Sequence, residues 1–413
     1  MKILMISEYF PPVGKGGGEI SAYLLAKHLV KNKITVHVLT SHFDNLKRIE
    51  TVDGIKIHRF LQTGKNPSIF KDNIKRILKF EKSLLKETLL LSEKENYDVI
   101  HCMNTSSIPT VKLKHIIKKP FILHVNGPVM FCPKGTLMYK DEIPCNIECN
   151  TQNFTTCFLS SKNIGKTNLK PYLKYNPLLM YLLKKRYNSM QQYMKLFDRF
   201  FAISTYMKTR LLMSGINEAE IDIVYNITET KDFINLKQKK NKILKILYLG
   251  EYSKPKGPHI IIDALKKLKI NYEANFYGKG VLEDYMLQEK ILYNLNINVN
   301  NIVPYDFVPK IIEEHDIVIF PSFVGEAFGR VALESCYAGK TVLASNIGGV
   351  KDIIDEGKTG YLFVPGDSDK LAELIKMCRT NRLKPESVRK LTLQKFSNET
   401  TIKQVKKIYT SFL

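Results

Sequence analysis

Two glutamates near position 330 have the residue type and spacing of side chains that could hold a sugar. Glu326 and Glu334 follow the apolar run 317–320, whose β-branched residues are typical of a buried parallel strand. A glycine-containing turn separates that run from a predicted helix over 331–338, which Gly339 terminates. The amino end of a helix at the carboxyl edge of a parallel strand favours a diphosphate. Ionised carboxylates only accept hydrogen bonds, so we expect these two to bind hydroxyl groups.

The residues around both glutamates resemble the signature of the retaining glycosyltransferases of family 4, which have the GT-B architecture. The pattern is Pro-Ser-x3-Glu-Ala-Phe-Gly-x-Val-x-Leu-Glu over 321–334, followed by Ile-Gly-Gly at 347–349. The resemblance implies that Glu326 contacts the transferred sugar and that Glu334 holds the ribose diol of the nucleotide. It further implies that backbone amides of Phe328 and Gly329 help to seat the sugar. The plainer alternative is a surface helix with scattered acidic residues.

Length and charge restrict the class of protein. A chain of 413 residues is too long for one core and predicts two domains. The formal net charge is +23, of which +16 falls in residues 1–225, and such an excess attracts phosphates, anionic lipid surfaces or nucleic acid. We find no zinc-finger, RNP-like or heptad pattern, so we expect no nucleic-acid partner. No apolar run is long enough to span a bilayer, and seven cysteines without an export signal indicate a reducing, cytoplasmic location.

The first domain is predicted to open with a strand, a glycine-rich loop and a helix, as Rossmann-like units do. The loop over 11–19 lacks the spacing of a dinucleotide fingerprint, which disfavours a dehydrogenase. The resemblance implies that Gly17 and Gly18 face the donor phosphates; a merely flexible loop is the alternative. His124 ends a second predicted strand, where a histidine is more often a core or capping residue. The family has a histidine at this strand end that reaches the sugar, whereas His101 is a structural candidate.

Four cysteines form a cluster in a loop-like segment after His124. Four thiolates suit tetrahedral zinc, and one pair has the x3 spacing found in structural sites. We therefore predict a structural zinc site, with free thiols as the alternative, on Cys132, Cys145, Cys149 and Cys157.

The segment 161–199 is basic, with apolar and aromatic residues interleaved. Nine Lys or Arg residues and one Asp lie within 151–200. This composition predicts that the segment docks on an anionic membrane, which would place a lipid-linked or membrane-proximal acceptor at the active site. A helical hairpin whose apolar residues pack inside the domain is the alternative.

The second domain carries the remaining residues that we expect to bind the donor. The loop 251–257 follows a predicted strand, and in the family it supplies an Arg and a Lys to the donor diphosphate. Lys256 matches the Lys, but Glu251 stands at the Arg position, where a carboxylate would repel the diphosphate unless Lys254 substitutes. Gly278, in the turn after another predicted strand, is expected near the nucleotide base.

The predicted fold is therefore α/β, with two Rossmann-like domains facing across a cleft. The predicted boundaries are 1–225 for the acceptor-side domain with an insert about 130–199, 226–242 for a linker, 243–395 for the nucleotide-sugar domain, and 396–413 for a helix returning to the first domain. The predicted function is retaining transfer of a hexose-type sugar from a nucleoside diphosphate to a hydroxyl of a glycan or lipid-linked acceptor, without a catalytic metal, in cell-surface polysaccharide or glycolipid synthesis. The predicted catalytic residues are Glu326, His124 and Lys256. A non-catalytic sugar-nucleotide-binding or membrane-scaffolding protein of the same architecture is the rival hypothesis.

Overall fold

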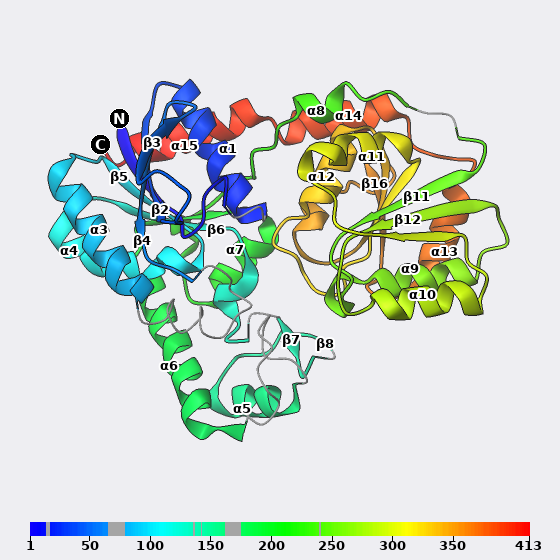
Figure 1. Ribbon diagram of the computed structural model, residues 1–413, viewed down its shortest axis with the longest axis horizontal. Coiled ribbons are helices and arrows are strands. Elements are labelled where there is room, and N and C mark those ends of the chain that lie inside the picture. The colour runs from blue at the N-terminus through cyan, green and yellow to red at the C-terminus, as the bar shows by residue number, and fades with distance from the viewer. Residues whose placement is uncertain (14–16, 65–78, 135–136, 142, 162–174, 239–240) are drawn as a thin grey trace. The chain divides into compact units, whose positions relative to one another are not determined.

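The computed structural model describes residues 1–13, 17–64, 79–134, 137–141, 143–161, 175–238 and 241–413. They form two compact units (Figure 1). The first unit comprises Met1–Ile227 and Asn398–Leu413, and the second unit comprises Thr228–Ser397.

The first unit is built on an eight-stranded sheet with the order β10-β9-β6-β5-β1-β2-β4-β3. All neighbouring strands are parallel except β3, which is antiparallel to β4 at one edge. The strands are β1 (Lys2–Ile6), β2 (Thr35–Ser41), β3 (Ile49–Val52), β4 (Ile55–Leu61), β5 (Val99–Met103), β6 (Phe121–Val125), β9 (Arg199–Ala202) and β10 (Ile221–Ile223). The central strands β5 and β6 are buried along their whole length, as expected where helices cover both faces of a parallel sheet.

The helices of the first unit are α1 (Gly17–Lys31), α3 (Glu81–Lys94), α4 (Lys114–Ile117), α5 (Thr151–Ser160), α6 (Pro177–Met194), α7 (Thr205–Met213) and α15 (Asn398–Thr410). Helix α15 comes from the end of the chain and packs against α1. Its residues Ile402, Val405, Ile408 and Tyr409 belong to the same buried cluster as the strands β1 and β2. The predicted return of the last helix to the first domain therefore has a physical cause, because α15 covers apolar side chains of that sheet.

An insert between β6 and β9 projects from the first unit (Figure 1). It contains the short strands β7 (Met138–Tyr139) and β8 (Ile143–Pro144) and the helices α5 and α6. Asn150 and Asn176 each cap one of these helices, because their side chains accept hydrogen bonds from backbone N–H groups in the first turn.

The second unit is built on six parallel strands with the order β13-β12-β11-β14-β15-β16. The strands are β11 (Leu244–Leu249), β12 (Tyr272–Tyr277), β13 (Ile297–Asn300), β14 (Ile317–Phe320), β15 (Thr341–Ser345) and β16 (Gly360–Phe363). The helices are α8 (Lys231–Ile234), α9 (Pro258–Lys266), α10 (Glu283–Leu292), α11 (Val308–Glu314), α12 (Arg330–Tyr337), α13 (Ser368–Cys378) and α14 (Pro385–Lys395). Helix α9 packs against α10 and α13, and α12 packs against α8 and α14. Figure 1 shows these two groups on opposite faces of the sheet.

The strand order of the second unit reverses direction between β11 and β14. Chain order runs outward from β11 to β13 on one side and from β14 to β16 on the other. Ligands of open α/β sheets bind at such a switch point, outside the carboxyl ends of the strands. The loops that follow β11 and β14 are therefore where the second unit is expected to bind its ligand, and the predicted residues Lys254, Lys256 and Glu326 lie in these loops.

Candidate functional site

Glu326 and Lys256 form an ion pair at the carboxyl ends of β14 and β11. Lys256 Nζ lies 2.9 Å from Glu326 Oε2, and Ser322 Oγ donates a hydrogen bond to Glu326 Oε1. Both charged side chains are partly exposed. The structure thus brings together the predicted sugar-binding carboxylate and the predicted diphosphate-binding cation, with the ammonium and the carboxylate both accessible to a ligand.

Three glycines hold the two loops in this arrangement. Gly257 has φ +75°, and a Cβ there would lie 1.9 Å from the Pro321 carbonyl oxygen, so the β11 loop approaches the β14 loop closely. Gly348 also has φ +75°, and a Cβ there would lie 2.6 Å from the Glu326 backbone nitrogen. The Gly349 N–H donates to the Glu326 carbonyl oxygen over 2.8 Å. Side chains at these positions would displace the backbone that carries Glu326.

Glu334 lies on α12 and is only 1% exposed. Its Oε1 accepts a hydrogen bond from the Tyr305 hydroxyl at 2.6 Å and lies 2.8 Å from Arg330 Nε. Burial raises the pKa of Glu334, while Arg330 and Tyr305 act in the opposite direction. Sequence reasoning missed both partners; the i,i+4 spacing of Arg330 and Glu334 on one helix was the available signal.

The other residues of the second unit that were predicted to bind the sugar-nucleotide donor shape the loops around the site. Phe328 is buried and packs edge-on against Phe396, with ring centroids 5.9 Å apart. Gly329 has φ +109° and is the residue before the first turn of α12. A Cβ at Gly278 would lie 1.9 Å from the Gly250 carbonyl oxygen, so this glycine is required for the close approach of the turns after β12 and β11.

Lys254 and Glu251 are both exposed in the loop after β11. Lys254 begins the 3-10 helix η6 (Lys254–Lys256), whereas the Glu251 carbonyl oxygen accepts hydrogen bonds from Tyr248 Oη and the Ser253 N–H. Tyr248 lies near the carboxylates of both Glu326 and Glu251, which add to the effect of burial in raising its pKa. Glu251 and Glu326 therefore share Tyr248 as a neighbour.

In the first unit, Gly18 and His124 converge on Asn104, which sequence reasoning did not single out. A Cβ at Gly18 would lie 3.4 Å from Asn104 Oδ1, and the Asn104 N–H donates to the His124 carbonyl oxygen over 3.2 Å. Asn104 follows β5 and has φ +68°. Gly17 begins α1, and residues 14–16 of the predicted glycine-rich loop lie outside the described residues.

His124 is 3% exposed and belongs to a buried group of polar rings. His124 Nδ1 lies 3.2 Å from His101 Nε2, and His101 Nδ1 is hydrogen-bonded to the Tyr409 hydroxyl of α15. Burial lowers the pKa of His124 to about 3, and burial followed by the field of His124 holds the pKa of His101 well below its usual range. Both rings are therefore neutral near pH 7.

The predicted zinc site is not formed. Within the described ranges, no group of three or more His, Cys, Asp or Glu side chains is arranged to hold a metal ion. The other three cysteines lie close enough to Cys149 to add to the effect of burial on its pKa, but Cys145 Sγ and Cys157 Sγ donate to the carbonyl oxygens of Ile147 and Met138. Burial raises the pKa of Cys149 to about 11.

The predicted membrane segment is described from residue 175 onward, whereas 162–174 lie outside the described residues. Three apolar side chains of α6 point outward at the i, i+3, i+4 spacing of one helix face: Leu178 is 63%, Tyr181 60% and Leu182 51% exposed. The opposite side is attached to the first unit through Gln191 Nε2, which donates to the Met130 carbonyl oxygen over 2.7 Å. The alternative that these three residues belong to the core is therefore wrong. No helix in the described part of the chain meets the length and hydropathy needed to cross a bilayer.

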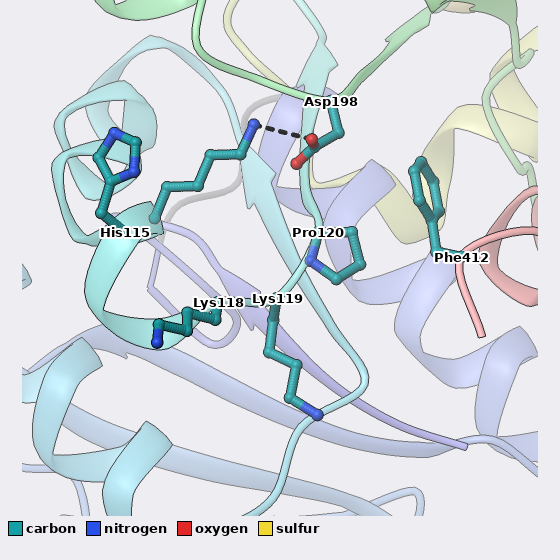
Figure 2. Close-up of a pocket in the computed structure, with 7 residues that line it drawn as sticks. His115, Lys118, Lys119, Pro120, Asp198 and Phe412 are labelled. Atoms are coloured by element: carbon teal, nitrogen blue, oxygen red, sulfur yellow. Dashed lines mark hydrogen bonds and ion pairs between the residues drawn. The ribbon is translucent and has the colours of Figure 1, made fainter.

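A cavity of about 440 Å³ lies at the amino ends of β6 and β9, opposite to the carboxyl end of β6 that carries His124 (Figure 2). It is lined by Pro120 and Asp198, which precede β6 and β9, and by the basic side chains Lys114, His115, Lys118 and Lys119, with Phe412 beside them. Asp198 is already bonded to Lys114 Nζ at 2.7 Å and to the Phe121 N–H at 2.8 Å. None of the predicted site residues lines this cavity.

Comparison with known proteins identifies the family. The profile described as Glycosyltransferase Family 4 matches residues 15–232, and the one described as Glycosyl transferases group 1 matches residues 228–392. An uncharacterised glycosyltransferase of Methanocaldococcus jannaschii is 25% identical over 379 residues, covering 90% of this chain and 87% of the relative. The lipopolysaccharide 1,6-galactosyltransferase of Escherichia coli is 24% identical over 187 residues, covering 43% of this chain and 51% of the relative.

The solved structure of Anabaena HepE in complex with UDP and glucose has a TM-score of 0.67 and 18% identity, covering 100% of both chains. The architecture is thus that of the GT-B enzymes, which confirms the predicted pair of parallel-sheet α/β domains. The chain belongs to glycosyltransferase family 4, whose members use nucleotide-sugar donors.

Proposed function

We propose that the protein transfers a hexose-type sugar, with retention of the anomeric configuration and without a catalytic metal, from a nucleoside diphosphate to a hydroxyl of a glycan or lipid-linked acceptor. The observation that carries this proposal is the Lys256–Glu326 ion pair at the carboxyl ends of β11 and β14. An ammonium and a carboxylate held at a sheet switch point suit a ligand with an anionic diphosphate and a polyhydroxylated sugar. The similarity to a lipopolysaccharide galactosyltransferase supports a role in cell-surface polysaccharide or glycolipid synthesis.

The second unit supplies the groups that would bind the donor. Lys256 would stabilise the negative charge that develops on the departing diphosphate, because a cation fixed beforehand needs no rearrangement in the transition state. Glu326 would accept hydrogen bonds from sugar hydroxyls once Lys256 turns to the diphosphate. Glu334 would hold the nucleotide ribose, and its burial against Arg330 and Tyr305 keeps the carboxylate in one orientation.

We further propose that the first unit docks on an anionic membrane through the outward face of α6, at the cytoplasmic side. Leu178, Tyr181 and Leu182 would enter the interface, and Lys185 and Arg186 follow them on the helix. Residues 149–197 contain no Asp or Glu, so no acidic side chain of this segment opposes binding to anionic lipid. Basic residues near such a surface contribute about 1 kcal/mol each, and the apolar face adds to that attraction.

Turnover of sugar nucleotides tests the proposed reaction. The chain is incubated with UDP-, GDP- and ADP-sugars, and release of the nucleoside diphosphate is measured together with the configuration of the product. We expect one donor class to turn over, and Glu326→Gln to lower kcat far more than it weakens binding of the bare nucleoside diphosphate. Binding of a sugar nucleotide with no release of diphosphate under any acceptor condition would favour a non-catalytic binding protein.

Liposome co-sedimentation tests the docking proposal. We expect binding to vesicles with anionic lipid but not to zwitterionic vesicles, with loss at high salt. The triple variant Leu178→Ser, Tyr181→Ser, Leu182→Ser should lose binding. Ile291→Ser, which removes an even more exposed apolar side chain from α10 of the second unit, should keep it. Equal recovery of the wild-type protein in the supernatant with both lipid types would contradict docking and would leave an enzyme whose acceptor is not at the membrane.

A further inference from the structure

His124, His101 and Tyr409 form a continuous hydrogen-bonded series inside the first unit. It runs from the Tyr409 hydroxyl on α15 to His101 Nδ1 on β5, and from His101 Nε2 to His124 Nδ1 on β6 over 3.2 Å. Tyr409 and His101 are fully buried, and His124 nearly so. Neither solvent nor a surface group therefore competes for these contacts.

One aromatic ring fixes the geometry of all three side chains. Phe201 of β9 packs edge-on against His101 at 5.3 Å and against His124 at 5.8 Å, and it stacks on Tyr409 at 6.1 Å. The two imidazoles stack on each other with centroids 5.3 Å apart. A half-turn of either imidazole would place carbon where a hydrogen-bonding nitrogen now lies, so the two nitrogen contacts set the ring orientations and only the positions of the protons remain to be determined.

Only two proton arrangements make both contacts hydrogen bonds, since each neutral imidazole carries one ring proton. In the first, Tyr409 donates to His101 Nδ1, His101 Nε2–H donates to His124 Nδ1, and His124 keeps its proton on Nε2. In the second, every donor is reversed, and the Tyr409 hydroxyl becomes the acceptor. Its own proton would then be buried with no acceptor among the hydrogen bonds of the described residues.

The two arrangements differ in the number of unsatisfied polar groups. His124 Nε2 has no hydrogen-bond partner within the described part of the chain in either case. The second arrangement adds the orphaned Tyr409 hydroxyl proton, and a buried donor without an acceptor is costly. The first arrangement is therefore favoured.

We infer that Tyr409, acting through His101, holds His124 in the tautomer that carries its proton on Nε2. Tyr409 and His101 are positioning residues, and His124 Nε2–H is a buried donor that has no acceptor among the described residues and would gain one only from a bound ligand. This inference deepens the proposed function, on which it rests for the identity of that acceptor: an oxygen of a sugar hydroxyl or of the attacking alcohol. A neutral N–H donor would orient such an oxygen by one hydrogen bond, because a hydroxyl oxygen accepts through a lone pair.

Nitrogen-15 NMR of the full chain labelled at histidine reads the tautomer directly, because protonated and bare ring nitrogens have distinct shifts. We expect His101 and His124 both to carry the proton on Nε2 at neutral pH, with assignments from His101→Gln and His124→Asn. Observation of both rings protonated on Nδ1 would overturn the inference. The NMR measurement needs no substrate. A protein without transfer activity would therefore refute the proposed reaction, while the NMR spectrum would still decide the tautomer of His124.

Variants separate positioning from a merely structural role. Tyr409→Phe removes only the hydroxyl, and we expect His124 to become a mixture of tautomers; a single unchanged Nε2–H tautomer would show that Tyr409 does not set it. His101→Gln places an amide donor near the former Nε2, so it should retain kcat/KM. His101→Leu should lower kcat/KM roughly fivefold, which corresponds to one neutral hydrogen bond of about 1 kcal/mol. Equal losses in the Gln and Leu variants would contradict the role of His101 as a donor.

Discussion

Removal of the positive charge at Arg330 should destabilise the second unit in a pH-dependent way. Arg330→Met keeps most of the aliphatic stem but leaves the Glu334 carboxylate, 1% exposed, with Tyr305 as the remaining donor to Oε1. Breaking a buried ion pair by removing one partner typically costs 3–5 kcal/mol, because the remaining charge stays buried. In a domain of this size, that loss lowers the midpoint of thermal unfolding by roughly ten degrees.

The direction of the pH dependence follows from the pKa of Glu334. Burial already raises this pKa, and Arg330 is the strongest opposing influence, so the variant should raise it further. A carboxyl group with a higher pKa in the folded than in the unfolded state loses its proton first in the unfolded chain. Stability therefore falls as the pH rises from the unfolded pKa, about 4.3, towards the folded one, by up to about 1.4 kcal/mol per pH unit.

Urea unfolding at pH 5 and pH 7 measures this effect. We expect Arg330→Met to lose up to about 2.7 kcal/mol more at pH 7 than at pH 5, two pH units at the limiting slope. Lys370→Met is the matched control, because its partner Glu373 is exposed on α13 and such pairs contribute little. A loss in Arg330→Met that is equal at both pH values would refute the assignment of a charged, buried Glu334.

Three further predictions concern the glycines, the loop cations and the cysteines. Gly348→Ala should lower kcat strongly, because its Cβ would lie 2.6 Å from the Glu326 backbone nitrogen. Gly357→Ala, at a similar φ of +70° but with nothing within 4 Å of its Cβ, should lose only stability. Steady-state kinetics and thermal unfolding compare the two variants, and equal kcat values would contradict the steric argument. Lys256→Ala and Lys254→Ala should each raise the donor dissociation constant roughly tenfold if both side chains contact the diphosphate. Calorimetry measures this constant, and an unchanged value in Lys254→Ala would restrict the role to Lys256. A metal chelator should leave the midpoint of thermal unfolding unchanged, because the cysteines near Cys149 do not form a metal site; a clear drop would restore the zinc hypothesis.

The sequence predicted best those features that depend on local pattern. The apolar run 317–320 and the glycine turn after it are determined by neighbouring residues, and the structure has β14 and α12 there. Only one of the two partners of Glu334 could have been predicted from the sequence. Arg330 is four residues away on the same helix, but Tyr305 is 29 residues away. The zinc prediction finds no support among the described residues, because spacing constrains where cysteines lie along the chain but not where their sulfur atoms point.

The link between His124 and the end of the chain could not be predicted at all. Tyr409 is 308 residues from His101, and no periodicity in either segment indicates that their side chains meet. The exposure of Leu178, Tyr181 and Leu182 was equally undetermined by sequence, because an apolar cluster of that length fits either a core or a surface. Only tertiary packing distinguishes these cases.

Helix α15 also imposes an order on biosynthesis. Residues 1–227 leave the ribosome before the second unit is made, yet Ile402, Val405, Ile408 and Tyr409 are part of their core. During synthesis of the intervening residues, the nascent first unit therefore exposes the apolar surface that α15 will cover, and the His101 ring lacks its tyrosine partner. The second unit, whose residues are contiguous, can complete its fold earlier. The final maturation of the first unit thus waits for residues 398–413, and a chaperone that protects this surface would act in that interval.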